Sequence, residues 1–224
     1  MAILPYCIFS CDVKVELRST GVRTADLELA CSDELKAIYS EHVELGNLTK
    51  DDALAFHEVI YGIFSQVVVI PFRFPTLLDS RAELEEHLAA NAQAYVEDLQ
   101  LFRDFVQMEL VIAGVHTANR RQARTFISGA DFLRTRSQNM SLLRGAAQTA
   151  HRVLDENVAD WRENEPTFNN SKGEIVRCFA LVERAKLPAF CQQLRESVSL
   201  GSSISQSGPW PPTAFMKSMT KAPA

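Results

Sequence analysis

Side chains that could catalyse a reaction or hold a metal ion are scattered along this sequence, without a spacing that serves either purpose. His57-Glu58 is followed, four positions after the histidine, by Tyr61, so the paired histidines of an HExxH zinc motif are absent. The sequence contains no CxxC, GxSxG, GxxxxGK or GxGxxG motif, which are the signatures of thiol redox enzymes, serine hydrolases and nucleotide-binding loops. We therefore expect a protein that is not an enzyme and needs no metal or cofactor.

The five cysteines form an odd, scattered set: Cys7, Cys11, Cys31, Cys178 and Cys191. Because the first residues, Met1-Ala-Ile-Leu-Pro-Tyr, lack the basic region of an export signal, we expect a cytoplasmic protein with reduced thiols. The alternative is a thiol enzyme, in which one cysteine would react much faster than the others.

The overall composition is that of a globular protein with a sizeable core. The chain has 224 residues, 46% of them hydrophobic, and a formal net charge of -5 from 23 basic and 28 acidic residues. This balance gives no general attraction to nucleic acid or to an anionic membrane. No apolar run reaches the roughly 18 residues that a membrane-spanning helix requires.

A local excess of arginine interrupts this balance. Seven arginines and only two acidic residues lie between residues 110 and 155, and Arg120, Arg121 and Arg124 are the densest group. Such a face fits either an RNA-binding module or a solvated surface that meets an acidic partner protein. No predicted strand carries the aromatic pattern of an RNA-recognition sheet, so no nucleic acid is expected.

The first 64 residues predict a small α+β domain. Apolar stretches at residues 3–10, 26–31 and 35–40, separated by turn residues, are typical of strands. Thr49, with Asp52 three positions later, predicts a capped helix that closes this domain.

Residues 65–224 predict a second domain with a ferredoxin-like, split βαβ fold. Its first half would be a strand at 66–74, a helix capped by Ser80 and Glu83, and a strand at 106–112. Its second half would be a strand at 174–182, a helix at 187–198 and a strand at 198–204. Between the halves, at about 114–170, we expect a mostly helical insertion, and we expect the tail at 216–224 to be frayed.

An apolar seam runs through this insertion at spacings of three and four residues. It consists of Met140, Leu143, Ala147, Ala150, Leu154, Asn157 and Trp161. Because two of the seven positions are alanine, the seam favours packing within the domain over an intermolecular coiled coil.

The segment Gly208-Pro-Trp-Pro-Pro212 has the most unusual local composition. Proline fixes φ and lacks an N–H donor, so we expect this segment to leave the sheet and run as a stiff polyproline-like chain. Trp210 would then either close the end of the core or stand exposed as an anchor for a partner.

The C-terminal stretch Gly208-Pro-Trp-Pro-Pro-Thr-Ala-Phe215 resembles the Gly-Pro-Trp-Pro-Pro-Tyr-Ser-Phe stretch of the GvpF/GvpL family of gas vesicle accessory proteins. Val69-Ile-Pro-Phe-Arg-Phe-Pro-Thr76 is similar to the Leu-Pro-Phe-Arg-Phe-Gly-Thr stretch of that family. A weaker similarity covers Gly129-Ala-Asp-Phe-Leu133. Pro75 replaces the usual glycine, and Met108-Glu109 replaces the Trp-Gly that commonly follows the long helix.

The resemblance implies a non-enzymatic protein required to build the gas vesicle, a hollow shell whose main subunit is small and hydrophobic. It implies binding to the shell subunit and to other accessory proteins, as a chaperone, a nucleation factor or a minor vesicle component, in the cytoplasm and associated with gas vesicles. An open sheet edge near Pro71 would pair with a strand of the partner. Arg73 would either bind a partner or tie the domains together. The other residues expected at the partner surface are Pro209, Trp210, Pro211, Pro212, Phe215, Arg120, Arg121 and Arg124.

Overall fold

The computed structural model confirms the α+β class and describes residues 2–17, 19–113, 129–169, 173–197 and 203–220. The chain forms two compact units. Unit 1 comprises Met1–Phe105 and Trp210–Ala224, and unit 2 comprises Val106–Pro209. This division differs from the boundary that the sequence predicted after residue 64. The chain of unit 1 is therefore interrupted by the whole of unit 2.

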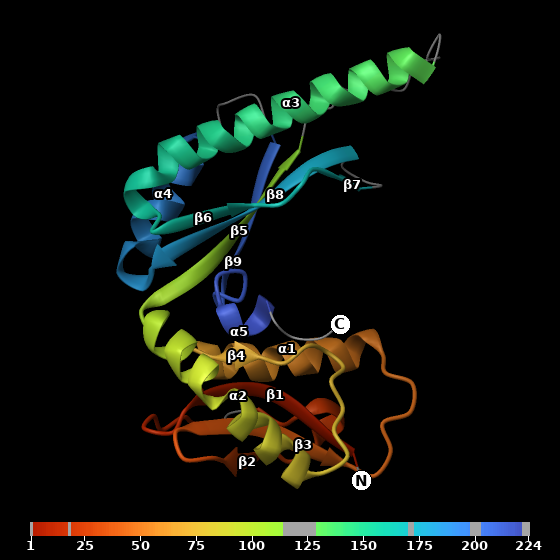
Figure 1. Ribbon diagram of the computed structural model, residues 1–224, viewed down its shortest axis with the longest axis vertical. Coiled ribbons are helices and arrows are strands. Elements are labelled where there is room, and N and C mark those ends of the chain that lie inside the picture. The colour runs from red at the N-terminus through yellow and green to blue at the C-terminus, as the bar shows by residue number, and fades with distance from the viewer. Residues whose placement is uncertain (1, 18, 114–128, 170–172, 198–202, 221–224) are drawn as a thin grey trace. The chain divides into compact units, whose positions relative to one another are not determined.

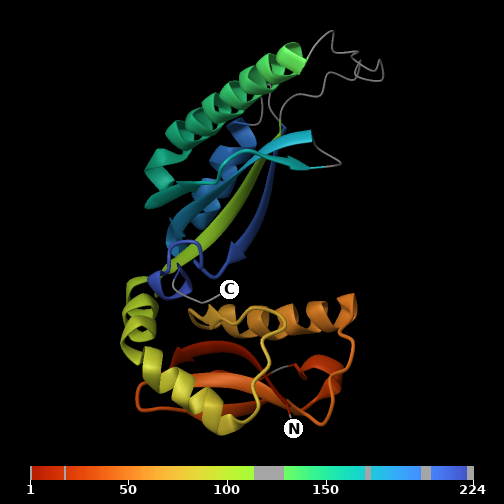
Figure 2. The same ribbon diagram turned by 45° about the vertical axis from the view of Figure 1, so that its right-hand side comes forward.

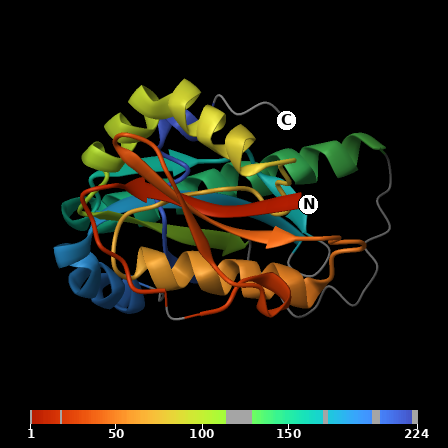
Figure 3. The same ribbon diagram turned by 90° about the horizontal axis from the view of Figure 1, so that it is seen from below.

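Unit 1 is built on a four-stranded sheet, sheet A, in the order β2-β3-β1-β4. Its strands are β1 (Ala2–Ser10), β2 (Glu28–Cys31), β3 (Leu35–His42) and β4 (Ile70–Pro71), and every pairing is antiparallel. The strands lie between the helices α1 (Lys50–Phe64) and α2 (Arg81–Leu101), as Figures 1 and 3 show. Because helices cover both faces, strand β1 is buried along almost its whole length.

Helices α1 and α2 begin where the sequence predicts. Thr49 Oγ1 accepts a hydrogen bond from the backbone N–H of Asp52, whose carboxylate accepts one in return from the N–H of Thr49. At the start of α2, Ser80 Oγ accepts a hydrogen bond from the backbone N–H of Glu83. The Glu83 carboxylate accepts a hydrogen bond from the backbone N–H of Asp79. These caps satisfy N–H groups that have no partner within the helix.

The strand predicted at residues 66–74 is only two residues long. Pro71 has no N–H with which to continue the ladder, and beyond it the chain follows β1 through isolated hydrogen bonds. The N–H of Phe72 donates to the carbonyl of Tyr6 (2.9 Å), and Ile3 and Leu78 exchange two backbone hydrogen bonds. Residues 70–78 therefore cover the outer edge of β1, and β4, which contains Pro71, is itself an edge strand of sheet A.

Unit 2 contains a second sheet, sheet B, in the order β6-β8-β5-β9, with β7 also paired to β8. Along the chain its elements are β5 (Phe105–Ala113), α3 (Gly129–Leu154), β6 (Asp160–Glu163), β7 (Thr167–Asn169), β8 (Gly173–Glu183), α4 (Leu187–Ser197) and β9 (Ser203–Trp210). With β6 and β7 as successive pieces beside β8, this is the β-α-β-β-α-β order of a ferredoxin-like fold.

The ferredoxin-like arrangement begins later in the chain than the sequence predicted. Strand β4 belongs to sheet A, and α2 packs on sheet A as well, so neither is part of the first βαβ half. That half consists of β5, α3 and β6, and the helix assigned to an insertion is the first helix of the fold. The latter part of that predicted insertion contains strands β6 and β7.

Helix α3 packs on sheet B through the predicted apolar seam. Leu143, Ala147, Ala150 and Leu154 are buried, and α3 contacts both β8 and α4 (Figure 2). The helix ends at Leu154, before the last two seam positions. Trp161 lies on β6, where its ring stacks on His151 of α3 at a centroid distance of 4.9 Å. The seam thus serves internal packing, as expected.

Candidate functional site

The segment after β4 holds Arg73 between two anchored phenylalanine rings. Phe72 packs against His87 of α2, with ring centroids 5.7 Å apart. Phe74 packs against Phe56 of α1, with centroids 5.1 Å apart. Because the two neighbours of Arg73 are fixed on different helices, the backbone at Arg73 has little freedom to move.

Arg73 itself is exposed. Its carbonyl accepts hydrogen bonds from the N–H and the hydroxyl of Thr76, both at 2.7 Å, which close a tight turn. Among the residues that the structure describes, its guanidinium makes no hydrogen bond or ion pair. Arg73 is therefore displayed at the surface of unit 1 and needs no buried acidic partner.

The C-terminal segment does not leave the sheet at Gly208. Strand β9 continues through Gly208 and Pro209 to Trp210, which the sequence did not predict. Strand β9 is the last strand in the order of sheet B, and an edge strand tolerates a proline because one row of its backbone groups needs no partner in the sheet. The proline-rich segment therefore begins at Pro211.

Beyond β9 the C-terminal segment buries its prolines and the apolar residues that follow them. Pro211 and Pro212 are buried, Phe215 is 4% exposed and Met216 is 0% exposed. Trp210, in contrast, is 39% exposed. Phe215 and Met216 thus fill the core of unit 1, while the indole of Trp210 remains partly accessible.

A buried carboxylate fixes the end of this segment. Asp98 of α2 is 2% exposed and accepts hydrogen bonds from the backbone N–H groups of Lys217 (3.2 Å) and Ser218 (2.8 Å). These two residues begin the short helix α5 (Lys217–Thr220). Residues 216–220 are therefore ordered on α2 and are not frayed, because the carboxylate satisfies the first N–H groups of α5. The rest of the tail that the sequence predicted to be frayed, 221–224, lies outside the described residues.

The Arg73 turn and the C-terminal segment are both attached to α2, but at different places. Phe72 contacts His87, and α5 is capped by Asp98, eleven residues further along. At 1.5 Å per residue, the two attachment points are about 16 Å apart along the helix. Arg73 and Trp210, which the sequence predicted to bind a partner, therefore both belong to unit 1, but they lie on two separately anchored segments.

A polar network inside unit 1 was not predicted from the sequence. The hydroxyl of Tyr6 accepts a hydrogen bond from the N–H of Val22 (2.8 Å) and shares another with Ser40 Oγ (2.8 Å). Ser40 Oγ also lies 2.8 Å from Nε2 of His42. Burial raises the pKa of Tyr6, although both hydrogen bonds oppose this shift. Tyr6 lies at an irregularity of β1, where the register with β3 shifts between Pro5 and Cys7.

Beside this network, Arg23 pairs with the carboxylate of Asp52 at 3.3 Å. The hydrogen bond from Arg23, followed by the one from the Thr49 backbone, lowers the pKa of Asp52 to about 2. Burial lowers the pKa of His42, and the nearby Arg23 lowers it further. The charges that act on His42 are therefore one cation and one carboxylate.

Acidification is expected to destabilise the protein in two separate ranges of pH. Burial lowers the folded-state pKa of both His42 and His87 below 6.5, so the unfolded chain binds more protons and the free energy of unfolding falls as the pH drops below 6.5. Asp52, with its pKa lowered from 3.8 to about 2, adds a further loss only below 3.8.

Urea unfolding measured between about pH 7.5 and pH 4.5 tests this expectation. The variant His42→Gln/His87→Gln should show a smaller loss of the free energy of unfolding over this range than the unchanged protein. Equal losses in the two proteins would contradict the assignment to these histidines.

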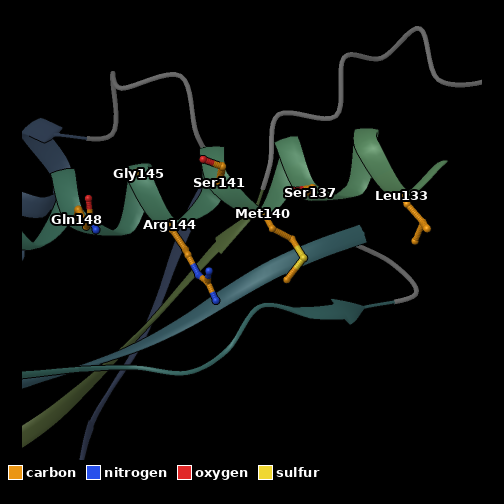
Figure 4. Close-up of a pocket in the computed structure, with 7 residues that line it drawn as sticks. All are labelled: Leu133, Ser137, Met140, Ser141, Arg144, Gly145 and Gln148. Carbon is orange, nitrogen blue, oxygen red and sulfur yellow. The ribbon is translucent and has the colours of Figure 1, made fainter. Parts of the chain in front are cut away.

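The arginine group expected from the sequence cannot be placed, because Arg120, Arg121 and Arg124 lie outside the described residues. The neighbouring helix α3 borders an open hollow of about 710 Å³, lined by Leu133, Ser137, Met140, Ser141, Arg144, Gly145 and Gln148. Figure 4 shows the side chains of Leu133, Met140 and Arg144 pointing toward the strands below the helix. None of the described residues predicted to bind a partner lines this hollow.

The thiols of Cys7 and Cys178 are unsuited to nucleophilic chemistry. Burial raises the pKa of Cys7, and it raises the pKa of Cys178 to about 12, so both stay protonated at neutral pH. Across the described ranges there is no group of three or more His, Cys, Asp or Glu side chains suited to a metal ion.

None of the helices in the described part of the chain is long and apolar enough to cross a membrane. A comparison with curated protein sequences finds no significant match. Two similar solved structures are the gas vesicle protein GvpF from Anabaena sp. PCC7120 and GvpF from Microcystis aeruginosa. The alignment with the first has a TM-score of 0.78 and 13% sequence identity, and it covers 96% of this chain and 96% of the other. The second has a TM-score of 0.76 and 13% identity and covers 96% of this chain and 99% of the other.

These structural similarities concern the fold. The family described as gas vesicle synthesis protein GvpL/GvpF matches residues 2–217, which include both the Arg73 turn and the Trp210 segment. The chain therefore belongs to the GvpL/GvpF family of gas vesicle synthesis proteins.

Proposed function

We propose that this protein is a non-enzymatic assembly factor of the gas vesicle, which binds the shell subunit and other accessory proteins as a chaperone or nucleation factor. In this proposal it works in the cytoplasm, in association with the vesicle. A small hydrophobic shell subunit aggregates unless its apolar surface is covered until it reaches the growing shell. The proposal assigns this covering role to an exposed apolar anchor on unit 1.

Trp210 is the observation that carries the proposal. The residues after it are fixed by the buried Pro211, Pro212 and Phe215, and the capping of α5 by Asp98 holds the end of the segment. An indole on a rigid segment loses little conformational entropy when it binds, and tryptophan is strongly enriched among the residues that dominate binding energy.

Arg73 is the second contact in this proposal. It is exposed on a turn fixed by Phe72 and Phe74, so its guanidinium is free to pair with a carboxylate or with backbone carbonyls of a partner. The Arg73 turn and the Trp210 segment are attached to α2 at points about 16 Å apart along the helix. Contacts at Arg73 and Trp210 therefore suit an extended partner surface better than a small molecule.

Co-purification with a tagged shell subunit tests the role of Trp210. The substitution Trp210→Ala is expected to reduce capture of the shell subunit at least tenfold, which corresponds to a loss of about 1.4 kcal/mol or more at a dominant contact. Trp161→Ala is the matched control, because Trp161 is a partly exposed tryptophan of unit 2 and should leave capture unchanged. Full capture by Trp210→Ala would remove this residue from the site.

The same assay tests Arg73 by charge reversal. Arg73→Glu should weaken capture, while Arg103→Glu, which reverses another exposed arginine of unit 1, should not. Unfolding by urea should show all four variants to be folded, so that lost capture reports binding.

A further inference from the structure

Strand β2 is an edge strand of sheet A. In the order β2-β3-β1-β4, β2 has β3 as its only neighbour. At the opposite side of the sheet, residues 70–78 hydrogen-bond along the outer edge of β1, and only Ile70 and Pro71 among them form a strand. Of the two edge strands, β2 is the longer, with four residues against two in β4, and it contains no proline.

The register identifies which backbone groups face outward. Ser32 donates its N–H to the carbonyl of Leu35 at 2.9 Å across the β2–β3 turn. Directly opposed pairs in an antiparallel ladder alternate between bonded and non-bonded, so Ala30 and Glu28 are bonded to their partners on β3. The N–H and C=O groups of Leu29 and Cys31 therefore point to the open edge. Both residues are exposed, Leu29 to 38%.

The edge is acidic along its length. Asp26, Glu28, Asp33 and Glu34 lie in or beside β2, and residues 25–35 contain no lysine or arginine. In the described part of the chain none of these four carboxylates has an ion-pair partner; Glu28 accepts only a neutral hydrogen bond, from the Tyr39 hydroxyl at 2.8 Å. In the described part of the chain the next cation, Lys36, forms no ion pair with these carboxylates; its Nζ donates to the carbonyl of Cys11 at 2.8 Å.

We propose that β2 receives an extended segment of another protein, whose β-forming residues alternate with lysine or arginine. The segment would pair with the N–H and C=O groups of Leu29 and Cys31, and its cations would meet the four carboxylates. A second copy of this chain is a poor occupant, because pairing β2 with itself would bring two sets of like charges together. This binding edge is separate from Trp210 and does not depend on shell capture through that residue.

The ¹⁵N-labelled full chain, titrated with a synthetic peptide, tests the proposal. The probe peptide is Lys-Val-Thr-Val-Lys-Val-Thr-Lys, and the control peptide has glutamate in place of each lysine. The lysine peptide should shift the amide signals of residues 28–32 and slow hydrogen exchange of the Leu29 and Cys31 amides. The glutamate peptide should bind at least about tenfold more weakly.

Two substitutions at one position separate backbone pairing from side-chain contact. Leu29→Pro removes an outward N–H that bonds to nothing in sheet A, so the protein should stay folded but lose binding of the lysine peptide. Leu29→Thr keeps the N–H and should retain binding. The probe is a peptide and the readout is local, so its result stands apart from the co-purification assay with Trp210→Ala.

Three results would overturn the proposal. Absence of any shift at millimolar lysine peptide would mean that the carboxylates only protect the edge against aggregation. Equal affinity for both peptides would exclude recognition of charge. Concentration-dependent shifts of residues 28–32 without peptide would identify a second copy of the chain as the occupant.

Discussion

Replacing Gly21 by alanine is expected to lower the free energy of unfolding of unit 1 by about 3 kcal/mol, from steric overlap together with a disturbed hydrogen-bond network. A Cβ atom at this position would lie 2.5 Å from the hydroxyl oxygen of Tyr6 and 3.2 Å from the carbonyl oxygen of Ala25. Tyr6 is fully buried and is held by Val22 and Ser40, so it cannot move aside without losing both hydrogen bonds.

Urea unfolding followed by tryptophan fluorescence measures this loss. All proteins in this experiment carry the substitution Trp161→Phe. Trp210, which belongs to unit 1, is then the one remaining tryptophan and reports the unfolding of that unit. Gly62→Ala is the matched control: a Cβ there meets nothing within 4 Å, so within α1 it should stabilise by about 0.5–1 kcal/mol. In a Tyr6→Phe background, which lacks the hydroxyl, Gly21→Ala should cost only about 1 kcal/mol. An undiminished loss in that background would show that Tyr6 is not the obstacle.

Replacing Asp98 by alanine is expected to cost unit 1 a similar amount, about 3 kcal/mol, because hydrogen bonds to a charged acceptor are among the stronger ones in proteins. The substitution removes the acceptor of two N–H groups at the start of α5. The C-terminal segment should then detach, which would expose Phe215 and Met216 and increase the hydrogen exchange of residues 211–220.

Two further variants separate the roles of the Asp98 side chain. Asp98→Asn keeps one acceptor oxygen and should lose less than half as much stability as the alanine variant. Asp104→Asn removes an exposed carboxylate of unit 1 and should change the free energy of unfolding by no more than about 0.5 kcal/mol. Unchanged exchange of residues 211–220 in Asp98→Ala would contradict the anchoring role.

The parts of the fold that were predicted correctly depend on local chemistry. The caps of Thr49 and Ser80 are specified by residues three positions apart, and the strands of unit 1 before residue 43 are separated by recognisable turns. The apolar seam of α3 was identified by its periodicity alone. The α+β class followed from these elements.

The errors arose where partners are distant in sequence. Residues 66–74 are rich in β-formers, yet only Ile70 and Pro71 pair with β1. Local composition cannot show that this segment and the following helix belong with the first sheet, so the first βαβ half was assigned to the wrong elements. Pro209 indicated that the chain leaves the sheet at Gly208, but β9 is an edge strand, where proline is tolerated.

The candidate site was predicted in part. The motifs indicated Arg73 and Trp210, but their exposure depends on Phe56, His87 and Asp98, which pack against the motif segments from other helices. Asp98 and Ser218 are 120 positions apart, and nothing in the local sequence marks an aspartate in the middle of a helix as a cap. The open edge at β2 likewise follows only from the strand order.

The interrupted path of unit 1 sets an order of events during synthesis on the ribosome. The residues that cap and fill its core, from Trp210 onward, are made last, and domains ordinarily fold as they emerge. Unit 2 is complete in the nascent chain while Asp98 still lacks its two N–H donors. A translation product truncated before residue 210 would consequently carry a finished second unit and a first unit whose interior stays open, a natural target for proteolytic quality control.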